Sequence, residues 1–460
     1  MKVFNPATEE LIRELSEDSA ESLRKKESVL RRGCSTQGLE SWRQVPLEER
    51  IQRLARFSEK LEKNKKELAR ILTNEMGKPI RESLNEIAGA RSRIQFFLDH
   101  SAEILKSRVV HEEPGMTESL EFEPLGVIAN ISAWNYPYLV GVNVFVPALI
   151  AGNAVLYKPS EYATLTGLEI ARLLWESGVP ESAFQIVVGG APVGQALLDL
   201  PLDGYFFTGS YRTGRFIAGE VASKMVPFGL ELGGKDPLYV AEDVTDLAKV
   251  TAAAVEGVFY NNGQSCCAVE RIYVHQKIYD RFLENFLKGV GRLKVGNPLE
   301  PETTQGPLAR PAHLQFLEKQ VREAVGQGAK VLTGGRRWGK KGGFFEPTVL
   351  TEVNHKMSLM KEETFGPVIG IQRVSGDEEA VQLMNDTEYG LTASVYSGSE
   401  ERAKKILRQI NAGTGYWNCC DRVSPYLPWS GRKNSGIGST LSFLGIQAFV
   451  KPKAYHLRLL

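Results

Sequence analysis

Short apolar runs alternate with helix-forming stretches through the middle of this chain. The apolar runs lie at residues 127–132, 154–157, 184–188, 204–207 and 226–230. Helical patterns lie between them, at residues 138–151, 165–177, 192–198 and 213–224. Apolar strands separated by helices predict a parallel, doubly wound sheet with helices on both faces.

The flanking regions have other patterns. Residues 9–33 are charged, which predicts a helical segment on the surface. Apolar residues recur at helical spacing from Pro46 to Ile71 and again over residues 81–105, and both stretches predict packing helices. Further apolar runs follow Gly233, and they predict a second α/β domain; they lie at residues 237–240, 271–274, 330–332 and 368–372.

Two polar, alternating segments stand apart from these sheets. Residues 109–123 predict a hairpin around Pro114-Gly115, and residues 446–460 predict an edge strand. The hairpin has little apolar surface for a core of its own. Both segments are therefore candidates for contacts with another domain or another subunit.

Composition narrows the choice of partners. The 460 residues carry a net charge of +1 and show no basic stripe with aromatic residues, so nucleic acid and anionic membranes are not expected partners. No apolar run reaches the ~18 residues of a membrane helix, and the first residues form no signal region. Four of the five cysteines are in adjacent pairs, which predicts a reducing, cytoplasmic compartment. The six histidines lack zinc-ligand spacing, so no metal is expected.

Polar residues and glycines follow the predicted strands. The carboxyl ends of parallel strands meet at one edge of an open sheet, where ligands bind. The residues at these ends are Trp134-Asn135, Lys158-Pro159-Ser160-Glu161, Gly189-Gly190, Thr208-Gly209-Ser210 and Glu231. Their types are those of a nucleotide and reaction site.

Each of these residues has a chemical interpretation and a structural one. Glu161, beside Lys158, could accept hydrogen bonds from ribose hydroxyls and repel a 2′-phosphate, or the two could be a solvated pair. Glu231 could act as a general base and Asn135 as an oxyanion donor, or both could serve as turn or capping residues. The segment that begins at Gly209 could hold a pyrophosphate at a helix start, although Tyr211 interrupts the dinucleotide fingerprint.

Cys266 follows a Gly-Gln turn signal in the segment 261–268. A thiolate in this position would be a strong nucleophile. A buried, inert filler is the other interpretation, since free cysteine is among the most buried residue types. Neither interpretation can be chosen from this segment alone.

Seven segments in order resemble the motifs of the NAD(P)-dependent aldehyde dehydrogenase superfamily. They are Trp134-Asn135-Tyr136-Pro137, Lys158-Pro159-Ser160-Glu161, Phe207-Thr208-Gly209-Ser210, Glu231-Leu232-Gly233-Gly234-Lys235, Gly263-Gln264-Ser265-Cys266, Glu363-Thr364-Phe365-Gly366-Pro367, and Pro428-Trp429-Ser430-Gly431 with Lys433, Ser435 and Gly436. In the last segment Trp429 replaces the usual Phe and Ser430 replaces a Gly. Seven motifs in the correct order favour the nucleophile interpretation of Cys266.

The resemblance implies a role for each residue. Cys266 would attack an aldehyde, Asn135 would stabilise the oxyanion, and Glu231 would activate the water that hydrolyses the thioester. The cofactor would be NAD, with NADP as an alternative. Its binding residues would be Trp134, Lys158, Ser160, Glu161, Gly209, Ser210, Leu232, Glu363 and Phe365. The substrate tunnel would be lined by Val140, Asn143, Ser265, Cys267, Val423 and Trp429.

The aldehyde itself is open at this stage. Superfamily members that act on carboxylate-bearing aldehydes tend to place arginines in the tunnel, where this chain has Asn143 and the pair Tyr260-Asn261. This favours a neutral or apolar aldehyde, although Arg422 near the tunnel mouth leaves a charged one open. The alternatives are a coenzyme A-acylating enzyme, a semialdehyde dehydrogenase, or a catalytically silent structural protein on the same fold.

The resemblance also implies a domain plan and an assembly. We expect an NAD-binding domain at residues 1–107 and 125–231, to which residues 431–445 return, and a catalytic domain at residues 232–430. Residues 108–124 and 446–460 would form a small β arm. This arm would join copies of the chain into a homodimer or homotetramer.

Overall fold

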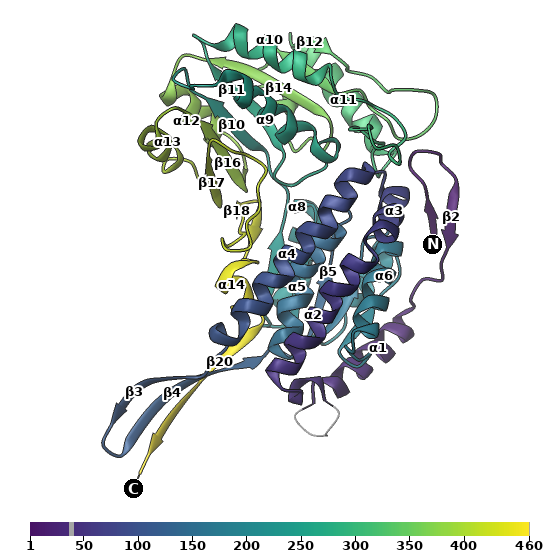
Figure 1. The fold of residues 1–460 in the computed structure, drawn as a ribbon, viewed down its shortest axis with the longest axis vertical. Helices are drawn as coiled ribbons and strands as arrows, with labels where there is room; N and C mark the ends of the chain where they lie inside the picture. The colour runs from purple at the N-terminus through teal and green to yellow at the C-terminus, as the bar shows by residue number, and fades with distance from the viewer. Residues whose placement is uncertain (36–40, 460) are drawn as a thin grey trace.

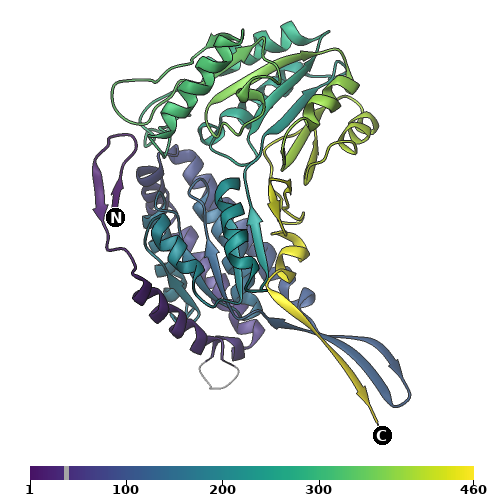
Figure 2. The ribbon, with the colours of Figure 1, turned by 180° about the vertical axis from the view of Figure 1, so that it is seen from behind.

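The computed structural model describes residues 1–35 and 41–459, and two α/β parts lie one above the other in it (Figure 1). Residues 36–40, within the predicted domain segment 1–107, and Leu460, at the end of the predicted tail, lie outside the described residues. A narrow arm projects from the lower part and carries the C-terminal end of the chain, as the view from behind also shows (Figure 2). Within the described residues, no helix has both the length and the apolar character needed to cross a membrane.

The lower sheet confirms the predicted doubly wound pattern. Its strand order is β19-β9-β8-β5-β6-β7, and all strands except β19 are parallel. The strands are β5 (Val127–Ile131), β6 (Ala154–Lys158), β7 (Phe184–Ile186), β8 (Gly204–Thr208), β9 (Phe228–Glu231) and β19 (Gly436–Ile437). Side chains alternate between the faces of a strand, so Ile128 packs into one apolar cluster while its neighbour Val127 packs into the other.

Helices cover both faces of this sheet. One face carries α1 (Ala20–Gly33), α7 (Ala191–Leu198) and α8 (Tyr211–Ala222). The other face carries α2 (Leu47–Lys63), α3 (Lys65–Met76), α4 (Ile80–Ile104), α5 (Pro137–Ala151), α6 (Thr164–Glu176) and α14 (Ser442–Gln447). Helix α5 begins at Pro137, whose ring suits a first helical turn, and ends at Gly152 with φ 97°, a left-handed conformation that favours glycine.

The upper sheet has the strand order β12-β13-β14-β11-β10-β16-β17, with only β12 antiparallel. The strands are β10 (Asp236–Val240), β11 (Val269–His275), β12 (Lys330–Thr333), β13 (Thr348–Thr351), β14 (Val368–Val374), β16 (Thr392–Tyr396) and β17 (Thr414–Trp417). Its helices are α9 (Leu247–Phe259) and α10 (Tyr279–Val290) on one face, and α11 (His313–Gly326), α12 (Asp377–Asn385) and α13 (Glu400–Leu407) on the other. The predicted strands are present, whereas β13, β16 and β17 were missed.

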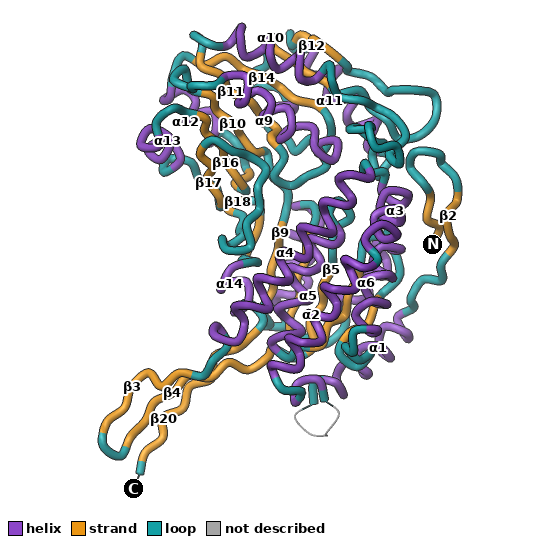
Figure 3. The backbone as a smooth tube through the Cα atoms, viewed as in Figure 1, coloured by secondary structure: helices purple, strands orange, loops and turns teal. Residues whose placement is uncertain are grey.

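The arm is a three-stranded sheet in which β4 (Met116–Pro124) lies between β3 (Arg108–Glu113) and β20 (Val450–Arg458) (Figure 3). The predicted hairpin is confirmed. The predicted tail strand is correct for β20 but wrong at its start, because Ile446 and Gln447 end helix α14. Smaller pairs elsewhere join β1 (Lys2–Phe4) to β2 (Leu11–Glu14) and β15 (Tyr389–Gly390) to β18 (Arg432–Lys433).

Two helix predictions need correction. The helix expected over residues 9–33 begins only at Ala20, because Ser19 accepts a hydrogen bond from the backbone N–H of Ser22 and caps the helix there. Residues 11–14 form strand β2 instead. The helical run after Pro46 is divided at Asn64 into α2 and α3.

Candidate active site

A cavity of about 1500 Å³ lies at the carboxyl ends of the lower strands and extends to the segment that carries Cys266. All the residues predicted for the site lie in its wall: Trp134, Asn135, Val140, Asn143, Lys158, Ser160, Glu161, Gly209, Ser210, Glu231, Leu232, Ser265, Cys266, Cys267, Glu363, Phe365, Val423 and Trp429. The chain therefore brings together side chains that are up to ~300 residues apart in sequence. What each side chain can do depends on its burial and its partners.

Cys266 is partly exposed to this cavity, and a constrained turn holds it there. After helix α9 the chain reverses through the 3-10 segment η2 (Tyr260–Gly263), in which Asn261, Asn262 and Gly263 have φ of 52°, 57° and 69°. A Cβ at position 263 would lie 2.4 Å from the carbonyl oxygen of Gly366, so only glycine fits. The turn thus presents the thiol while its own backbone is buried.

Asn135 is joined to the same turn. Its side-chain Nδ2 donates to the carbonyl of Gln264 at 3.2 Å, and its own carbonyl accepts from Nδ2 of Asn261 at 3.1 Å. Only 4% of Asn135 is exposed. These reciprocal bonds set the amide of Asn135 beside the cysteine turn, where a donor could stabilise negative charge on a bound oxygen.

Glu231 ends strand β9 and faces the cavity. Burial raises the pKa of its carboxyl to about 7, while a hydrogen bond from Thr440 Oγ1 and the charge of Arg93 act in the opposite direction. A carboxyl with a pKa near neutrality can take and release a proton under physiological conditions. This property is the one that a general base requires.

The region of the cavity around Lys158 and the start of helix α8 has hydrogen-bond donors that suit a dinucleotide. Lys158 is 4% exposed, and the single hydrogen bond of its ammonium group within the described residues is a long one, 3.4 Å to the carbonyl of Pro159. Its neighbour Ser160 donates to Glu161 at 3.1 Å. Helix α8 begins beside them with Ser210 as its cap, so backbone N–H groups point into the same space. These donors fit ribose hydroxyls and a pyrophosphate.

Glu363 and Phe365 form the boundary between the two regions. The backbone N–H of Gly234 donates to Glu363 Oε1 at 3.1 Å, and a Cβ on Gly233 would lie 2.1 Å from that oxygen. Burial raises the pKa of Glu363, and the charge of Glu270 adds to this. The ring of Phe365 lies edge-on to Trp134, with 5.5 Å between centroids. The glycine loop and Glu363 therefore fit together closely.

Sequence reasoning missed the groups that support this loop. Glu270 accepts from Lys235 Nζ at 2.7 Å and from the backbone N–H of Phe365 at 2.8 Å. Arg271 donates to the carbonyl of Lys235 at 2.8 Å and to carbonyls at the end of α12. The adjacent residues of β11 thus hold the loop from both sides.

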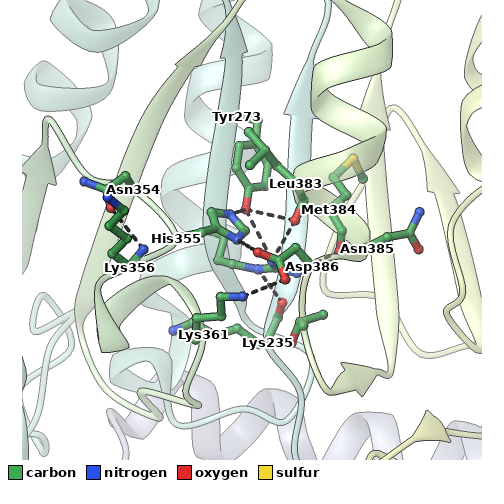
Figure 4. Close-up of polar contacts among 12 residues, drawn as sticks. Lys235, Tyr273, Asn354, His355, Lys356, Lys361, Leu383, Met384, Asn385 and Asp386 are labelled. Atoms are coloured by element: carbon green, nitrogen blue, oxygen red, sulfur yellow. Dashed lines mark hydrogen bonds and ion pairs between the residues drawn. The ribbon is translucent and has the colours of Figure 1, made fainter.

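A chain of polar contacts continues from this support toward the surface (Figure 4). The hydroxyl of Tyr273 lies 2.7 Å from Nε2 of His355, and Nδ1 of His355 lies 2.7 Å from Asp386. Lys361 also donates to Asp386, at 2.6 Å. These contacts join α12 to strand β11, and they lie outside the cavity wall.

The predicted tunnel residues share their wall with two charged residues that sequence reasoning missed, Arg93 and Asp421. Asp421 accepts from Cys267 Sγ at 3.0 Å and from Ser265 at 3.4 Å. The pKa of the Cys267 thiol is raised well above its usual value by its contact with Cys266 and by burial. Cys267 is therefore a buried partner of Asp421, unlike the partly exposed Cys266.

The sequence held one signal for these missed residues. Ala90, Arg93, Ile94 and Phe97 recur at helical spacing and are all buried on one face of α4. An arginine at a core-facing position of an amphipathic helix is a sign of a functional site. No comparable pattern surrounds Asp421.

Comparison with known proteins agrees with this geometry. Residues 1–455 match the model of the aldehyde dehydrogenase family. The chain is 34% identical over 457 residues to a peroxisomal aminoaldehyde dehydrogenase 1 of Pisum sativum, covering 98% of this chain and 91% of that protein. It is 35% identical over 463 residues to betaine aldehyde dehydrogenase 1 of Oryza sativa subsp. japonica, again covering 98% and 91%.

Solved structures show the same relationship. An NAD-dependent aldehyde dehydrogenase from Sinorhizobium meliloti superposes with a TM-score of 0.96 at 31% identity, covering 100% of this chain and 91% of that one. An NADP-dependent enzyme of E. coli gives a TM-score of 0.95 at 30% identity, covering 100% and 94%. The chain belongs to the aldehyde dehydrogenase family. It is an NAD(P)-dependent oxidoreductase that converts aldehydes to acids.

The different environments of the five cysteines predict a selective reaction. Brief treatment with iodoacetamide should alkylate Cys266 first, because it is partly exposed in the cavity, whereas Cys34, Cys267 and Cys420 are buried. Cys419 is partly exposed, but burial raises its pKa, so it should react more slowly. Peptide mass spectrometry over a time course measures this order. Earlier labelling of Cys267 or Cys419 would contradict it.

Proposed function

We propose that Cys266 is the nucleophile, Asn135 the oxyanion donor and Glu231 the general base of this aldehyde dehydrogenase. The observation that carries the proposal is their convergence on one cavity, with an accessible thiol, a fixed amide and a carboxyl whose pKa is about 7. Cys266 is partly exposed in this cavity, whereas Cys267 beside it is buried.

The arrangement suggests a sequence of steps. The thiolate of Cys266 attacks the carbonyl carbon, and the amide of Asn135 and the backbone N–H of Cys266 hold the resulting oxyanion. One such donor typically contributes about 2.7–4 kcal/mol. NAD, when held by the cofactor-binding residues, would supply the hydride acceptor, and Cys266 would keep the acyl group as a thioester. Glu231 then takes a proton from water, which hydrolyses the thioester and releases the acid.

The same residues support a choice of cofactor. Lys158, Ser160 and Glu161 would bind the adenosine ribose, and Ser210 and Gly209 the pyrophosphate; all five line the cavity. Glu363 would bind the nicotinamide ribose, beside Trp134, Leu232 and Phe365. We propose NAD rather than NADP, because the carboxylate of Glu161 would repel a 2′-phosphate.

Glu231 also favours hydrolysis over transfer to coenzyme A. A base that activates water would consume the thioester before a second substrate could take it. Taken from the sequence alone, the uncharged Asn143 favours a neutral acyl chain. Arg93, however, donates a hydrogen bond to Asn143 at 3.0 Å. This arginine adds a positive charge beside the tunnel residues that the sequence predicts.

We also propose a cytoplasmic homodimer or homotetramer, with the lower α/β part binding NAD at residues 1–107, 125–231 and 431–445 and the upper part, residues 232–430, carrying the catalytic thiol. The arm supports an assembly, because its outer strand β3 leaves Val109 and Val110 61% and 62% exposed. All five cysteines are unpaired, in keeping with a reducing compartment.

The first test is the reaction itself. The protein, NAD and a panel of aldehydes should produce NADH, measured by its absorbance. Cys266→Ala should abolish this signal, because the adjacent thiol of Cys267 is buried and donates to Asp421. Cys419→Ala is the matched control and should retain activity, since Cys419 lies outside the cavity wall. NADH production by Cys266→Ala would contradict the assignment of the nucleophile.

The second test is the pH profile. A base must be deprotonated, so kcat should rise with pH through about 7 and become level above it. Thr440→Val removes a hydrogen bond that favours the charged carboxylate, so it should raise the pKa of Glu231 by about half to one unit. The acid limb should then move to higher pH, with little change in rate at pH 9. An unmoved limb would exclude Glu231 as its source.

The third test addresses assembly. Light scattering should give a dimer or tetramer, and Val109→Asp with Val110→Asp should lower the mass toward the monomer by placing charge on the outer strand of the arm. Met225→Asp adds a charge at a residue that is 91% exposed and serves as the control. A wild-type monomer would contradict the proposal, and so would an assembly that both arm substitutions leave intact.

A further inference from the structure

Arg93 is a buried cation in the wall of the catalytic cavity, and the proposed chemistry gives it no direct task. Only 8% of the residue is exposed, and it lies on the core-facing side of α4. Arginine is rarely buried unless it is paired. The partners of its guanidinium group therefore indicate its function.

Few of its donors are used. Nη1 donates to Asn143 Oδ1 at 3.0 Å and to the carbonyl of Leu139 at 3.2 Å. Nε and Nη2 have no hydrogen-bond partner among residues 1–35 and 41–459. A guanidinium carries five N–H donors, and buried polar groups are almost always bonded. The remaining donors thus lie at the cavity wall without an acceptor from the chain.

Its charge is also unpaired, since Arg93 makes no salt bridge to any described residue. Glu86 and Glu231 are near enough to stabilise the cation. Glu86, however, is bound to Lys78 and to the backbone N–H of Tyr138. Glu231 accepts from Thr440 and is the proposed base. A buried charge without a partner is costly, so an anion in the cavity would offset this cost.

We propose that Arg93 binds the carboxylate of the substrate, which makes carboxylate-bearing aldehydes the preferred class. Asn143 positions the guanidinium, so an uncharged residue at that place still serves an anionic substrate. A planar guanidinium suits a carboxylate, because two parallel hydrogen bonds can form. The proposal rests on Cys266 acting as the nucleophile in the same cavity.

Asp421, in the same wall, attracts a cationic substrate less strongly than Arg93 attracts an anionic one. Asp421 already accepts hydrogen bonds from Cys267 and Ser265, and burial raises its pKa to about 7. It is therefore only partly ionised at neutral pH. Arg93, in contrast, stays charged in proteins and has donors to spare.

The experiment compares three aldehydes of similar length. Succinic semialdehyde carries a carboxylate, pentanal is neutral and 4-aminobutanal carries an ammonium group. The wild-type enzyme should show the highest kcat/KM for succinic semialdehyde. Arg93→Met should lower that value by about 10- to 100-fold, mainly through KM, because charge-assisted hydrogen bonds are lost. At pH 9, where Glu231 is ionised with or without Arg93, oxidation of pentanal should change by less than about threefold, since pentanal makes no such bonds.

Two controls separate binding from a structural role. Arg91→Met makes the same change on the same helix, but Arg91 pairs with Glu62 outside the cavity wall. The kcat/KM for each of the three aldehydes should therefore be unchanged. Arg93→Lys keeps the charge without the planar fork and should give an intermediate KM. Succinate should compete with pentanal in the wild type and compete more weakly in Arg93→Lys, which provides a test if Arg93→Met does not fold.

The outcomes are distinct. No NADH from any of the aldehydes would overturn the proposed function itself. Oxidation of pentanal without a preference for succinic semialdehyde would overturn only the role of Arg93, and so would a preference for 4-aminobutanal. An equal loss for all three aldehydes in Arg93→Met would show that Arg93 supports the site without binding the carboxylate.

Discussion

The carbonyl oxygen of Asn135 is the junction on which the site depends. It accepts from Lys78 Nζ at 2.7 Å and from Asn261 Nδ2 at 3.1 Å, which ties the proposed oxyanion donor, the cysteine turn and the start of α4 together. Lys78 is buried and ion-paired with Glu86. Glu82, one turn before Glu86, accepts from the backbone N–H of Asn261 at 2.8 Å. Breaking a buried pair of this kind typically costs about 3–5 kcal/mol, so the thiol and the amide are held in one fixed relation.

Much of the fold and the site could be predicted, because local sequence patterns indicate both the strands and the edge of the sheet at which ligands bind. Apolar strands that are buried on both faces, such as β5 and β6, form continuous apolar runs, and the ligand edge of such a sheet follows from topology. The strands that were missed lack this pattern. β13, β16 and β17 contain threonine, serine or glycine, and neighbouring strands of the sheet decide their conformation.

The residues that could not be predicted act through tertiary contacts. Glu82, Glu86 and Arg93 belong to a stretch that predicts only a packing helix, and Lys78 precedes it; nothing local shows which partner each one meets. Glu270 and Arg271 lie in a strand whose apolar neighbours account for the prediction, yet both turn toward the glycine loop. Sequence motifs therefore identify the residues proposed to contact the substrate, but they do not identify the residues that hold those side chains in place.

The pH affects binding of an anion and activation of water in the cavity in opposite directions. Arg93 stays positive, while Glu231 and Asp421 both have a pKa raised to about 7 by burial. Below neutrality both carboxyls gain protons, so the wall becomes more positive and attracts an anion more strongly, but the proposed base is lost. Above neutrality the base is available, but the carboxylates of Glu231 and Asp421 repel an anionic substrate. At the exposed mouth of the cavity, the opposite charges of Glu256 and Arg422 offset each other. Binding of an anionic aldehyde and activation of water therefore respond to pH in opposite directions, because the ionised carboxylate of Glu231 that activates water also repels the anion that Arg93 attracts.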